Sequence, residues 1–308
     1  MKYISSQVFA VLGAGFIGRA VIRNLLLKSK TVRVLDRNSC PSEFLSNTKW
    51  IKGVFEDKRA LRDLLDGVSV AYHLVSSTVP GDQHVDAARE LHDNVVTTLQ
   101  FISVCLEVGV KRIVFASSAS VYGVQELIPI KESASTNPIS THGINKLAIE
   151  KFLLLAKYHH DIEVQILRIS NPYGPGQSIS GRQGFIGMTI GHILRNSPVL
   201  LRNQGLAIRD YIYIDDLAEA FALAGELIDS PSVMNVGSGR GHSLRDVINI
   251  FSLLLNKSIA TNNIISRSVD IPSSILNIEL SQAFFASSHR TNLREGLIKT
   301  LNFHGFAV

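Results

Sequence analysis

Cysteine is scarce in this sequence, and no uncharged apolar run reaches the length needed to cross a membrane. The two cysteines, Cys40 and Cys105, lie far apart and have no Cys or His neighbours at the spacing of metal ligands. This pattern excludes a disulfide framework and a zinc site, so we expect no bound metal. It also agrees with a reducing compartment, and we therefore expect a soluble, cytoplasmic protein that does not bind a membrane.

Charge of one sign is not concentrated anywhere in the chain. The 31 Lys and Arg residues stand against 26 Asp and Glu residues, which gives a net charge of +5. The basic residues are scattered, and no stripe interleaves them with aromatic side chains, so nucleic-acid binding is not expected. A mild positive excess suits a small anionic ligand instead. The apolar run near the N-terminus carries Gly13 and Gly15 and leads into Arg19, so we expect no cleavable signal peptide.

Strand-like and helix-like segments alternate along the first 170 residues. Short apolar, strand-like runs are expected at residues 7–12, 31–35, 51–55, 69–74, 112–117 and 164–169. Helices are expected from the turn at residues 13–18 to about residue 28, and at residues 57–65, 85–107 and 139–160. This alternation predicts an α/β fold with a doubly wound parallel sheet that helices cover on both faces.

The segment Gly13-Ala14-Gly15-Phe16-Ile17-Gly18 follows the first strand-like run and opens the first helix. In such a turn the first two glycines allow a tight bend and close approach to a pyrophosphate, and the third lets the helix pack on the strand. The helix N-terminus presents its N–H groups to the negative charge. Asp36 ends the second strand-like run, about twenty residues on, where a ribose hydroxyl is usually held. The complete unit predicts a Rossmann dinucleotide-binding domain; the alternative is a glycine turn in another kind of α/β protein.

The acidic residue after the second strand bears on the choice of cofactor. The Asp36 carboxylate favours NAD because it repels a 2′-phosphate, whereas a guanidinium such as that of Arg37 can clamp this phosphate. NAD is therefore favoured, and NADP stays open. In the glycine turn and at the end of the second strand, cofactor contacts are expected at Gly13, Gly15, Phe16, Ile17, Gly18, Asp36 and Arg37.

Four further segments carry the pattern of one protein family. They are FASSASVYG at residues 115–123, NPISTHGINKLAIE at 137–150, RISNPYGPG at 168–176 and RDYIYIDDLA at 209–218. Together with the glycine turn they closely resemble the extended short-chain dehydrogenases/reductases of the NAD-dependent epimerase/dehydratase family. The nearest likeness is to nucleotide-sugar enzymes of the UDP-glucose 4-epimerase type, and it extends from Val8 to about Leu301.

The composition changes near residue 170. The segment at residues 171–176 is dense in turn residues, and the elements expected after it are shorter and mixed. We therefore expect residues 1–170 to form an NAD-binding Rossmann domain. Residues 171–308 are expected to form a smaller C-terminal lobe that binds the nucleotide sugar, with some chain crossing back to the Rossmann sheet.

The resemblance implies roles for individual positions. Ser118 matches the catalytic serine that hydrogen-bonds the sugar oxygen at C4, and Lys146 matches the lysine that holds the nicotinamide ribose. Arg209 and Arg267 match arginines that contact the substrate diphosphate. A guanidinium fork suits diphosphate oxygens, although an isolated arginine is more commonly a solvated surface residue. Further contacts are implied for Leu74 and Pro172 with the cofactor, for Asn171 with cofactor and sugar, and for residues 182–186 with the nucleotide.

Two groups of residues have simpler interpretations that stay open. The serines at positions 117, 118 and 120 can serve only to cap the end of a strand. Tyr211 and Tyr213 are expected to be core-facing strand residues rather than members of the site.

The chain departs from the family at the position of its catalytic tyrosine. The family motif Tyr-x-x-x-Lys places both side chains on one helical face, where the ammonium lowers the pKa of the phenol. In this chain the tyrosine position is occupied by His142.

Histidine is also a general acid or base, and Lys146 with an oxidised nicotinamide lowers its pKa and favours the neutral form. The imidazole is shorter than a phenol by about 2–3 Å, so the mechanism calls for a bridging water. The alternative is an inert residue in a site that has lost its chemistry.

These features predict hydride transfer at C4 of a nucleotide-diphosphate hexose, as in the synthesis of surface-polysaccharide sugars. A weakened acid/base group slows a 4-epimerase, which must first oxidise an alcohol, more than a reductase, which receives a ketone. We therefore favour a reductase of a dTDP-linked 4-keto-6-deoxyhexose over a UDP-hexose 4-epimerase. A 4,6-dehydratase is disfavoured because Ala119-Ser120 stand where that branch has Asp-Glu. A non-catalytic protein that binds NAD or nucleotide sugar is the remaining alternative, and a homodimer is expected.

Overall fold

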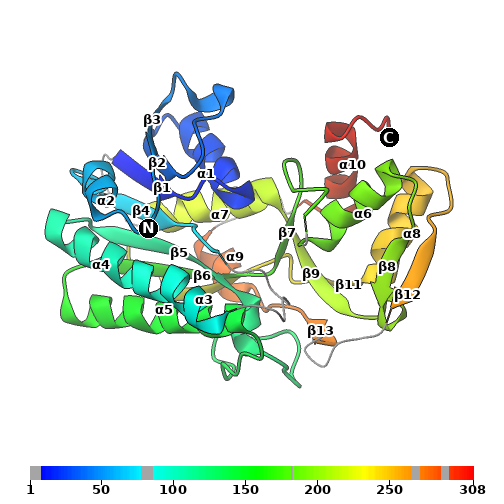
Figure 1. The fold of residues 1–308 in the computed structure, drawn as a ribbon. Coiled ribbons are helices and arrows are strands. Elements are labelled where there is room, and N and C mark those ends of the chain that lie inside the picture. Colours follow the sequence, from blue (N-terminus) through cyan, green and yellow to red (C-terminus); the bar gives the residue numbers. More distant parts are fainter. Residues whose placement is uncertain (1–7, 78–85, 182, 265–270, 286–290) are drawn as a thin grey trace.

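A sheet of parallel strands runs through the larger part of the molecule (Figure 1). The computed structural model describes residues 8–77, 86–181, 183–264, 271–285 and 291–308. Within these residues the sheet has seven strands in the order β10-β6-β5-β4-β1-β2-β3. Their bounds are β1 Val8–Leu12, β2 Thr31–Asp36, β3 Thr48–Lys52, β4 Val70–His73, β5 Arg112–Ser118, β6 Glu163–Ile169 and β10 Val233–Val236.

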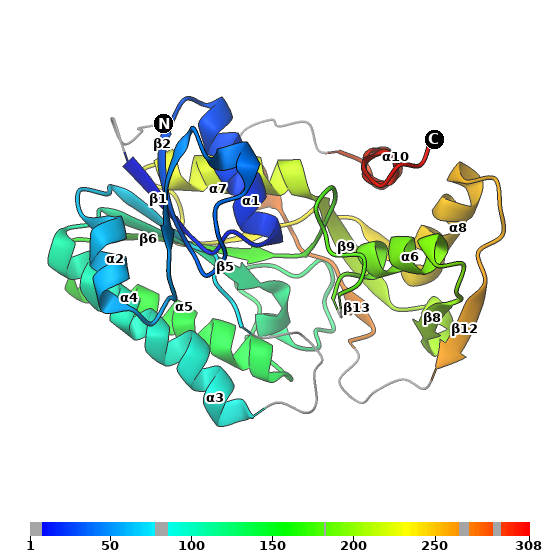
Figure 2. The same cartoon turned by 45° about the horizontal axis from the view of Figure 1, so that its top comes forward.

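Helices cover both faces of this sheet (Figure 2). The core on one face includes Val21 of α1 and Phe221 of α7, and the core on the other includes Leu61 of α2, Phe101 of α4 and Leu153 of α5. Because both faces are buried, the strands are apolar almost throughout rather than alternating. The predicted doubly wound α/β fold is confirmed. The helix bounds are α1 Phe16–Leu27, α2 Lys58–Leu65, α4 Thr97–Val108, α5 Thr141–His159 and α7 Ile214–Glu226.

Local signals account for where several helices begin and end. The carboxylate of Asp57 accepts hydrogen bonds from the backbone N–H of Arg59 (2.8 Å) and Ala60 (3.2 Å), and α2 therefore starts directly after it. Gly109 takes the left-handed conformation (φ +78°) and ends α4, as its position after the predicted helix indicates.

The third strand lies at Thr48–Lys52 rather than at the predicted residues 51–55. Pairing with β2 sets its bounds, because β2 ends at Asp36 and the last paired residue opposite it is Lys52. The apolar residues that follow belong to a turn, in which the carbonyl of Val54 accepts from the N–H of Asp57 (3.1 Å). The apolar run alone therefore misplaced the strand by three residues.

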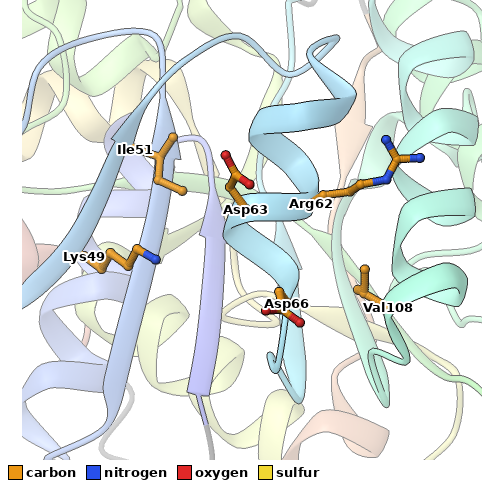
Figure 3. Close-up of a pocket in the computed structure, with 6 residues that line it drawn as sticks. All are labelled: Lys49, Ile51, Arg62, Asp63, Asp66 and Val108. Atoms are coloured by element: carbon orange, nitrogen blue, oxygen red, sulfur yellow. The ribbon is translucent and has the colours of Figure 1, made fainter.

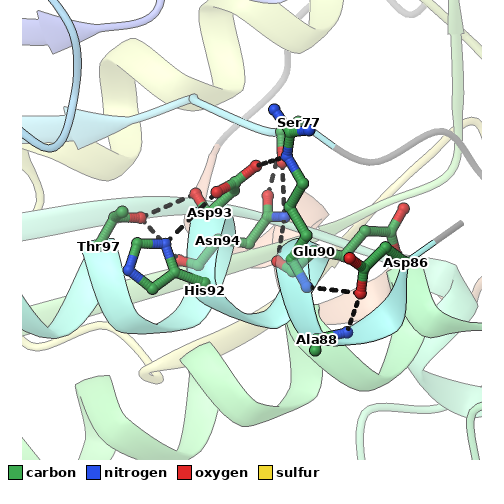
Figure 4. Close-up of polar contacts among 9 residues, drawn as sticks. Ser77, Asp86, Ala88, Glu90, His92, Asp93, Asn94 and Thr97 are labelled. Atoms are coloured by element: carbon green, nitrogen blue, oxygen red, sulfur yellow. Dashed lines mark hydrogen bonds and ion pairs between the residues drawn. The ribbon is translucent and has the colours of Figure 1, made fainter.

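The helix predicted at residues 85–107 is interrupted by a wider turn. Asn94 Nδ2 donates to the carbonyl of Glu90 (2.7 Å) and to Ser77 Oγ (2.8 Å), while its Oδ1 accepts from the N–H of Ser77 (3.0 Å) (Figure 4). Such side-chain bonds compete with the regular backbone pattern, and they attach this helix to the segment that follows β4. The chain here forms α3 (Ala87–Leu91), a π-helical turn (His92–Val96) and α4.

The chain after residue 170 builds smaller elements beside the main sheet (Figure 1). β9 is the centre of a small sheet in which β7, β11 and β13 pair with it, and β8 pairs with β12. Tyr211 and Tyr213 of β9 are buried, as expected of core-facing residues. Two later elements return to the main sheet, since β10 pairs with β6 and α7 packs against α1. The bounds are β7 Asn171–Tyr173, β8 Val199–Arg202, β9 Ile208–Tyr213, β11 Gly241–Ser243, β12 Thr261–Ile264, β13 Ser273–Ser274, α6 Phe185–Leu194, α8 Leu244–Leu254, α9 Glu279–Phe284 and α10 Leu293–Phe303.

Candidate active site

The glycine turn joins β1 to α1 at the carboxyl edge of the main sheet. Gly13 has φ +92°, a left-handed conformation that favours glycine, and its N–H donates to the carbonyl of Leu35 (2.9 Å). A Cβ placed on Gly18 would overlap the carbonyl oxygen of Gly13. Leu74, after β4, lies beside the same turn, since a Cβ on Gly13 would come within 3.2 Å of its carbonyl carbon. The first and third glycines are therefore required by the close packing of helix and strand.

The second glycine has a different environment. Among the described residues, a Cβ on Gly15 would meet no atom within 4 Å, so they leave open the space in front of the α1 N-terminus. Gly15 is the N-cap of α1, and within the same residues no side chain caps this end of the helix. The first N–H groups of the helix therefore point into open space, as the pyrophosphate of a dinucleotide requires. Phe16 and Ile17 are half-buried and pack against the core under the turn.

Asp36 is fixed to the glycine turn by its own carboxylate. One oxygen accepts from the N–H of Ala14 (2.7 Å), and the other accepts from the backbone and side chain of Asn38 (2.8 and 3.0 Å). A carboxylate offers about four acceptor positions, so the half-exposed group retains capacity for a ribose hydroxyl. Arg37 is exposed beside it. The geometry suits an NAD ribose at Asp36.

Ser118 ends β5 and caps the 3₁₀ turn Ala119–Tyr122. Its Oγ accepts from Ser120 Oγ (2.9 Å) and from the Ser120 N–H (3.2 Å). A serine oxygen has two lone pairs and one hydrogen, so this arrangement leaves the Ser118 hydrogen to be donated elsewhere. A Cβ on Gly143 would lie 2.6 Å from the carbonyl oxygen of Ser120. This close approach holds the start of α5 against the serine turn.

His142 lies in the first turn of α5, directly before Gly143, and is 8% exposed. Burial and the neighbouring ammonium of Lys146 lower the pKa of His142 to about 3. Both causes disfavour the imidazolium form. The imidazole is therefore neutral throughout the physiological pH range. This is the form that the sequence predicts from the neighbouring Lys146.

Lys146 lies one turn further along α5 and is also buried. Its Nζ donates to the carbonyl of Ala116 (2.8 Å) and lies 4.7 Å from the centroid of the Phe115 ring. Burial lowers the pKa of Lys146 to about 8, and the opposite charge of Glu150 limits the fall. The contact with Ala116 uses one of three ammonium hydrogens, so Lys146 has donors to offer to a cofactor ribose.

A second buried histidine lies beside this lysine. The Thr98 hydroxyl donates its hydrogen to the carbonyl of Asn94 (2.5 Å), so it accepts from His73 Nε2 (2.8 Å), which carries the ring proton. Burial and the charge of Lys146 hold the pKa of His73 well below its usual range. His73 is therefore neutral and adds no positive charge beside Lys146.

The substrate-binding residues expected after residue 170 lie on two paired strands. Asn171 of β7 stands opposite Tyr211 of β9, and its Nδ2 donates to the carbonyl of Asp210 (2.9 Å). Arg209 precedes Asp210 and is half-buried, with Nη1 donating to the carbonyl of Ile208 (2.8 Å). Strand pairing thus places Asn171 and Arg209 in one small sheet.

Three further positions with expected contacts are Pro172, Arg182 and Arg267. The carbonyl of Pro172 accepts from Gln177 Nε2 (3.0 Å), which fixes the chain directly after Asn171. Arg267 and Arg182, which the resemblance assigns to diphosphate and nucleotide, lie outside the described residues. Their roles stay predictions.

Sequence reasoning did not single out three buried residues of this region. His73, Glu150 and Arg168 are at most 5% exposed and lie close to Lys146 or to the strand that leads to Asn171. For Glu150 a signal was present, because a carboxylate four residues after Lys146 lies on the same helical face. His73 and Arg168 carried no spacing signal, since partners on neighbouring strands are set only by the fold.

A surface depression of about 640 Å³ lies away from these residues (Figure 3). Its wall is formed by β3, α2 and the end of α4, near the amino ends of the strands, whereas ligands of such sheets bind at the carboxyl ends. It is therefore no candidate for the active site. The lining residues are Lys49, Ile51, Arg62, Asp63, Asp66 and Val108.

Within the described ranges, no three His, Cys, Asp or Glu side chains converge in a way that could hold a metal ion. Among the helices of the same ranges, none combines the length and apolarity needed to cross a membrane. The cytoplasmic location expected from the sequence stays a prediction.

Comparisons with known proteins bear on the same site. Residues 10–237 match the model of the NAD dependent epimerase/dehydratase family. The dTDP-4-dehydro-6-deoxyglucose reductase of Escherichia coli is 31% identical over 256 residues, which cover 80% of each chain. The UDP-glucose 4-epimerase of Thermotoga maritima, solved with UDP-glucose, has a TM-score of 0.89 at 26% identity and covers 96% of this chain and 98% of its own. The UDP-glucose 4-epimerase of Thermus thermophilus, solved with NAD, has a TM-score of 0.89 at 26% identity and covers 97% and 100%.

Proposed function

Because the chain belongs to the NAD dependent epimerase/dehydratase family and is therefore an NAD-dependent enzyme of nucleotide sugars, we propose that it is a 4-keto reductase. The substrate class is a 4-keto-6-deoxyhexose carried on a nucleoside diphosphate, with dTDP favoured. The name of the Escherichia coli relative supports this substrate class. The glycine turn, Asp36 and Lys146 hold the cofactor, which supplies the hydride for C4 when it is bound as NADH.

The observation that carries this proposal is the neutral imidazole at the position of the family's tyrosine. With a pKa of about 3, His142 is a weak base at neutral pH and accepts a proton from an alcohol poorly. Oxidation of an unactivated alcohol, the first step of an epimerase, needs such a base. Reduction of a ketone needs hydrogen-bond donors at the oxygen instead, and we assign this role to two side chains.

The donors are the hydroxyl of Ser118 and the N–H of His142. The Ser118 oxygen accepts from Ser120, so its hydrogen is available for the C4 oxygen of the sugar. Because the imidazolium form of His142 is suppressed, the proton that completes the alcohol comes from solvent through the hydroxyl groups of Ser118 and Ser120. In this arrangement His142 stabilises the developing charge by donating a hydrogen bond.

The substrate diphosphate is assigned to the part of the chain after residue 170. Arg209 directly precedes Asp210, which is buried. The carboxylate of Asp210 accepts from the N–H groups of Ser238 (2.8 Å) and Gly239 (3.1 Å). These bonds fix the strand that carries Arg209. We assign NAD binding to residues 1–170 and nucleotide-sugar binding to residues 171–308, apart from α7 and β10.

A UDP-hexose 4-epimerase is the second candidate. Its support is the close likeness to two solved UDP-glucose 4-epimerases over nearly the whole chain. An epimerase with His142 would need that imidazole to take the proton of the C4 hydroxyl, directly or through one water.

One assay separates the two candidates. The purified protein is incubated with UDP-hexoses and with dTDP-4-keto-6-deoxyglucose, each with NADH or NADPH, and the products are identified by NMR. We expect stoichiometric reduction of the keto sugar and no interconversion of UDP-hexoses. Interconversion without net NADH consumption would favour the epimerase. Binding of NAD and nucleotide sugar without turnover in every combination would favour the non-catalytic alternative.

The homodimer is assigned to the exposed face formed by α4 and α5. Apolar side chains lie at helical spacing on α5, where Ile144 and Leu155 are about half exposed and Tyr158 is 83% exposed. Leu99 adds to them from the adjacent α4. An apolar face of this kind on a surface helix pair suits a second copy of the chain. Light scattering should give a dimer for the native chain and a monomer for Leu155→Glu.

A further inference from the structure

The carboxylate of Glu150 lies at the junction of three segments of the candidate active site. Arg168 Nη2 donates to Glu150 Oε2 (2.7 Å), and Arg168 Nε donates to both oxygens (3.0 and 3.2 Å). Ser117 Oγ donates to Glu150 Oε1. The Glu150 side chain is 1% exposed and the Arg168 side chain 7%, so this is a buried ion pair with a forked geometry.

Each partner is next to a residue with an assigned role. Glu150 lies one turn after Lys146 on the same face of α5. Ser117 directly precedes Ser118, and its opposite neighbour in the sheet is Arg168, three residues before Asn171. One carboxylate thus connects α5 with the ends of β5 and β6.

The guanidinium of Arg168 is itself held on its other side. Arg168 Nη1 donates to the hydroxyl of Tyr122 (3.1 Å), which donates to Asn235 Oδ1 (2.6 Å). Asn235 Nδ2 in turn donates to the carbonyls of Ile130 (2.9 Å) and Asn277 (3.1 Å). The buried network is therefore satisfied at each of these groups, which is the condition under which a buried charge pair is tolerated.

A buried ion pair adds little to stability compared with apolar residues of the same volume, so folding alone does not account for this one. Its charge acts on Lys146. The groups that face the Lys146 ammonium are the neutral His73 on β4, the neutral His142 and the anionic Glu150 on α5, and the aromatic ring of Phe115 on β5. Glu150 is the only anion among these described neighbours, and its charge opposes the fall that burial causes in the pKa of Lys146.

We propose that Glu150, held by Arg168 and Ser117 one helical turn after Lys146, is a positioning residue that keeps Lys146 charged for the cofactor ribose. Nothing in this role requires Glu150 to touch cofactor or substrate. The inference rests on the proposed function only in assigning the cofactor ribose to Lys146.

The test measures the ionisation of Lys146 directly. In protein with ¹³C-labelled lysine, the Lys146 side-chain signal is assigned by its loss in Lys146→Arg and is followed by NMR against pH. In Glu150→Gln the pKa of Lys146 should fall by about one pH unit, because the opposite charge one helical turn away is removed. The matched control is Glu163→Gln. It removes an exposed carboxylate of β6 that pairs with Lys157 of α5 (2.8 Å), and it should leave the pKa of Lys146 unchanged.

Cofactor affinity supplies a second measurement. Because Lys146 loses its charge at lower pH in Glu150→Gln, calorimetric NAD affinity should decline at lower pH than in the native chain. Glu150→Asp keeps the charge and should restore both the Lys146 titration and the affinity profile in large part.

A companion variant guards against misfolding, since Glu150→Gln leaves the guanidinium of Arg168 buried without its partner. In the double variant Glu150→Gln, Arg168→Met both charges are gone, so we expect a melting temperature closer to native. Because a like charge is lost together with the opposite one, the pKa of Lys146 should lie between its native value and its value in Glu150→Gln. A native Lys146 pKa in folded Glu150→Gln, or a pKa in Glu150→Asp as low as that in Glu150→Gln, overturns the proposal. None of these measurements uses a sugar, so a failed reductase assay leaves them unaffected.

Discussion

The two ends of the candidate active site are built in different ways. At the glycine turn the backbone makes the site, through the left-handed Gly13, the open space at Gly15 and the close approach at Gly18. At the start of α5 the site is made by buried side chains, and the pKa values of His142 and Lys146 are lowered to about 3 and about 8. A backbone site depends on shape, whereas a side-chain site also depends on which of its groups are ionised.

The largest effects are expected where shape alone decides. Gly15→Val should abolish NAD binding while the melting temperature stays close to native, because the added side chain fills open space rather than meeting protein atoms. Gly18→Val should lower the melting temperature strongly, because its Cβ overlaps the Gly13 carbonyl. Calorimetry with NAD and thermal unfolding measure the two effects. Undiminished NAD binding in Gly15→Val would refute the assignment of the turn.

This contrast also explains what could be predicted from the sequence. The glycine turn before α1 and Asp36 at the end of β2 could be predicted because their signal is local, with fixed spacing along one strand, turn and helix. The position of His142 was found through the resemblance, but the extent of its burial depends on β5 and the serine turn, which are distant in sequence. The partnership of Glu150 with Arg168 arises where α5 packs against β6, and pairing of β5 with β6 brings Ser117 beside it, so it could not be read from spacing.

The same distinction accounts for the misplaced elements. The β3 bounds depend on the length of β2, and the π-helical turn depends on the contact of Asn94 with Ser77 in the segment after β4. Both features rest on contacts between segments. The parallel sheet and its two covered faces were predictable because the alternation of strands and helices extends over the first 170 residues.

The next largest effect tests the side-chain end of the site. His142→Ala should lower kcat of ketone reduction by about 10²–10³, the usual effect of removing one donor to a developing oxyanion, with little change in NAD affinity. His142→Tyr, which restores the family residue, should retain reduction and increase the interconversion of UDP-hexoses. Steady-state kinetics and NMR of the products measure both. Unchanged turnover in His142→Ala would remove the imidazole from the mechanism and leave Ser118 as the donor.

Removal of the Arg209 guanidinium from the substrate lobe should have an effect of intermediate size on substrate binding. Arg209→Ala should raise KM for the nucleotide sugar by about 10- to 100-fold, since a hydrogen bond to a charged group contributes about 1.5–3 kcal/mol. NAD affinity should be unchanged. The control is Arg62→Ala, an arginine on α2 paired with Glu107 at the surface, which should alter neither value. An equal loss of cofactor and sugar affinity in Arg209→Ala would indicate misfolding instead.

A pH profile tests the side-chain end of the site without any substitution. Lys146 is charged below its pKa of about 8 and neutral above it, so NAD affinity and reduction should decline as pH rises from 7 to 9. With the pKa of His142 at about 3, no change due to this residue should occur between pH 5 and 7. A tenfold loss is expected about one pH unit above the Lys146 pKa. A profile that falls near pH 6.5 would assign the proton to an ordinary histidine.

The smallest effect concerns cofactor choice at the glycine turn. Asp36→Asn removes the charge that repels a 2′-phosphate but keeps an oxygen to accept from the N–H of Ala14, so the preference for NADH over NADPH should weaken about two- to fivefold. Asp36→Ala removes the charge and also this 2.7 Å bond, which holds the turn in shape. It should therefore shift the same preference while weakening both cofactors. If neither variant changes the ratio of the two affinities, Asp36 only braces the backbone. The ribose would then be held elsewhere, and the glycine turn would act through backbone geometry alone.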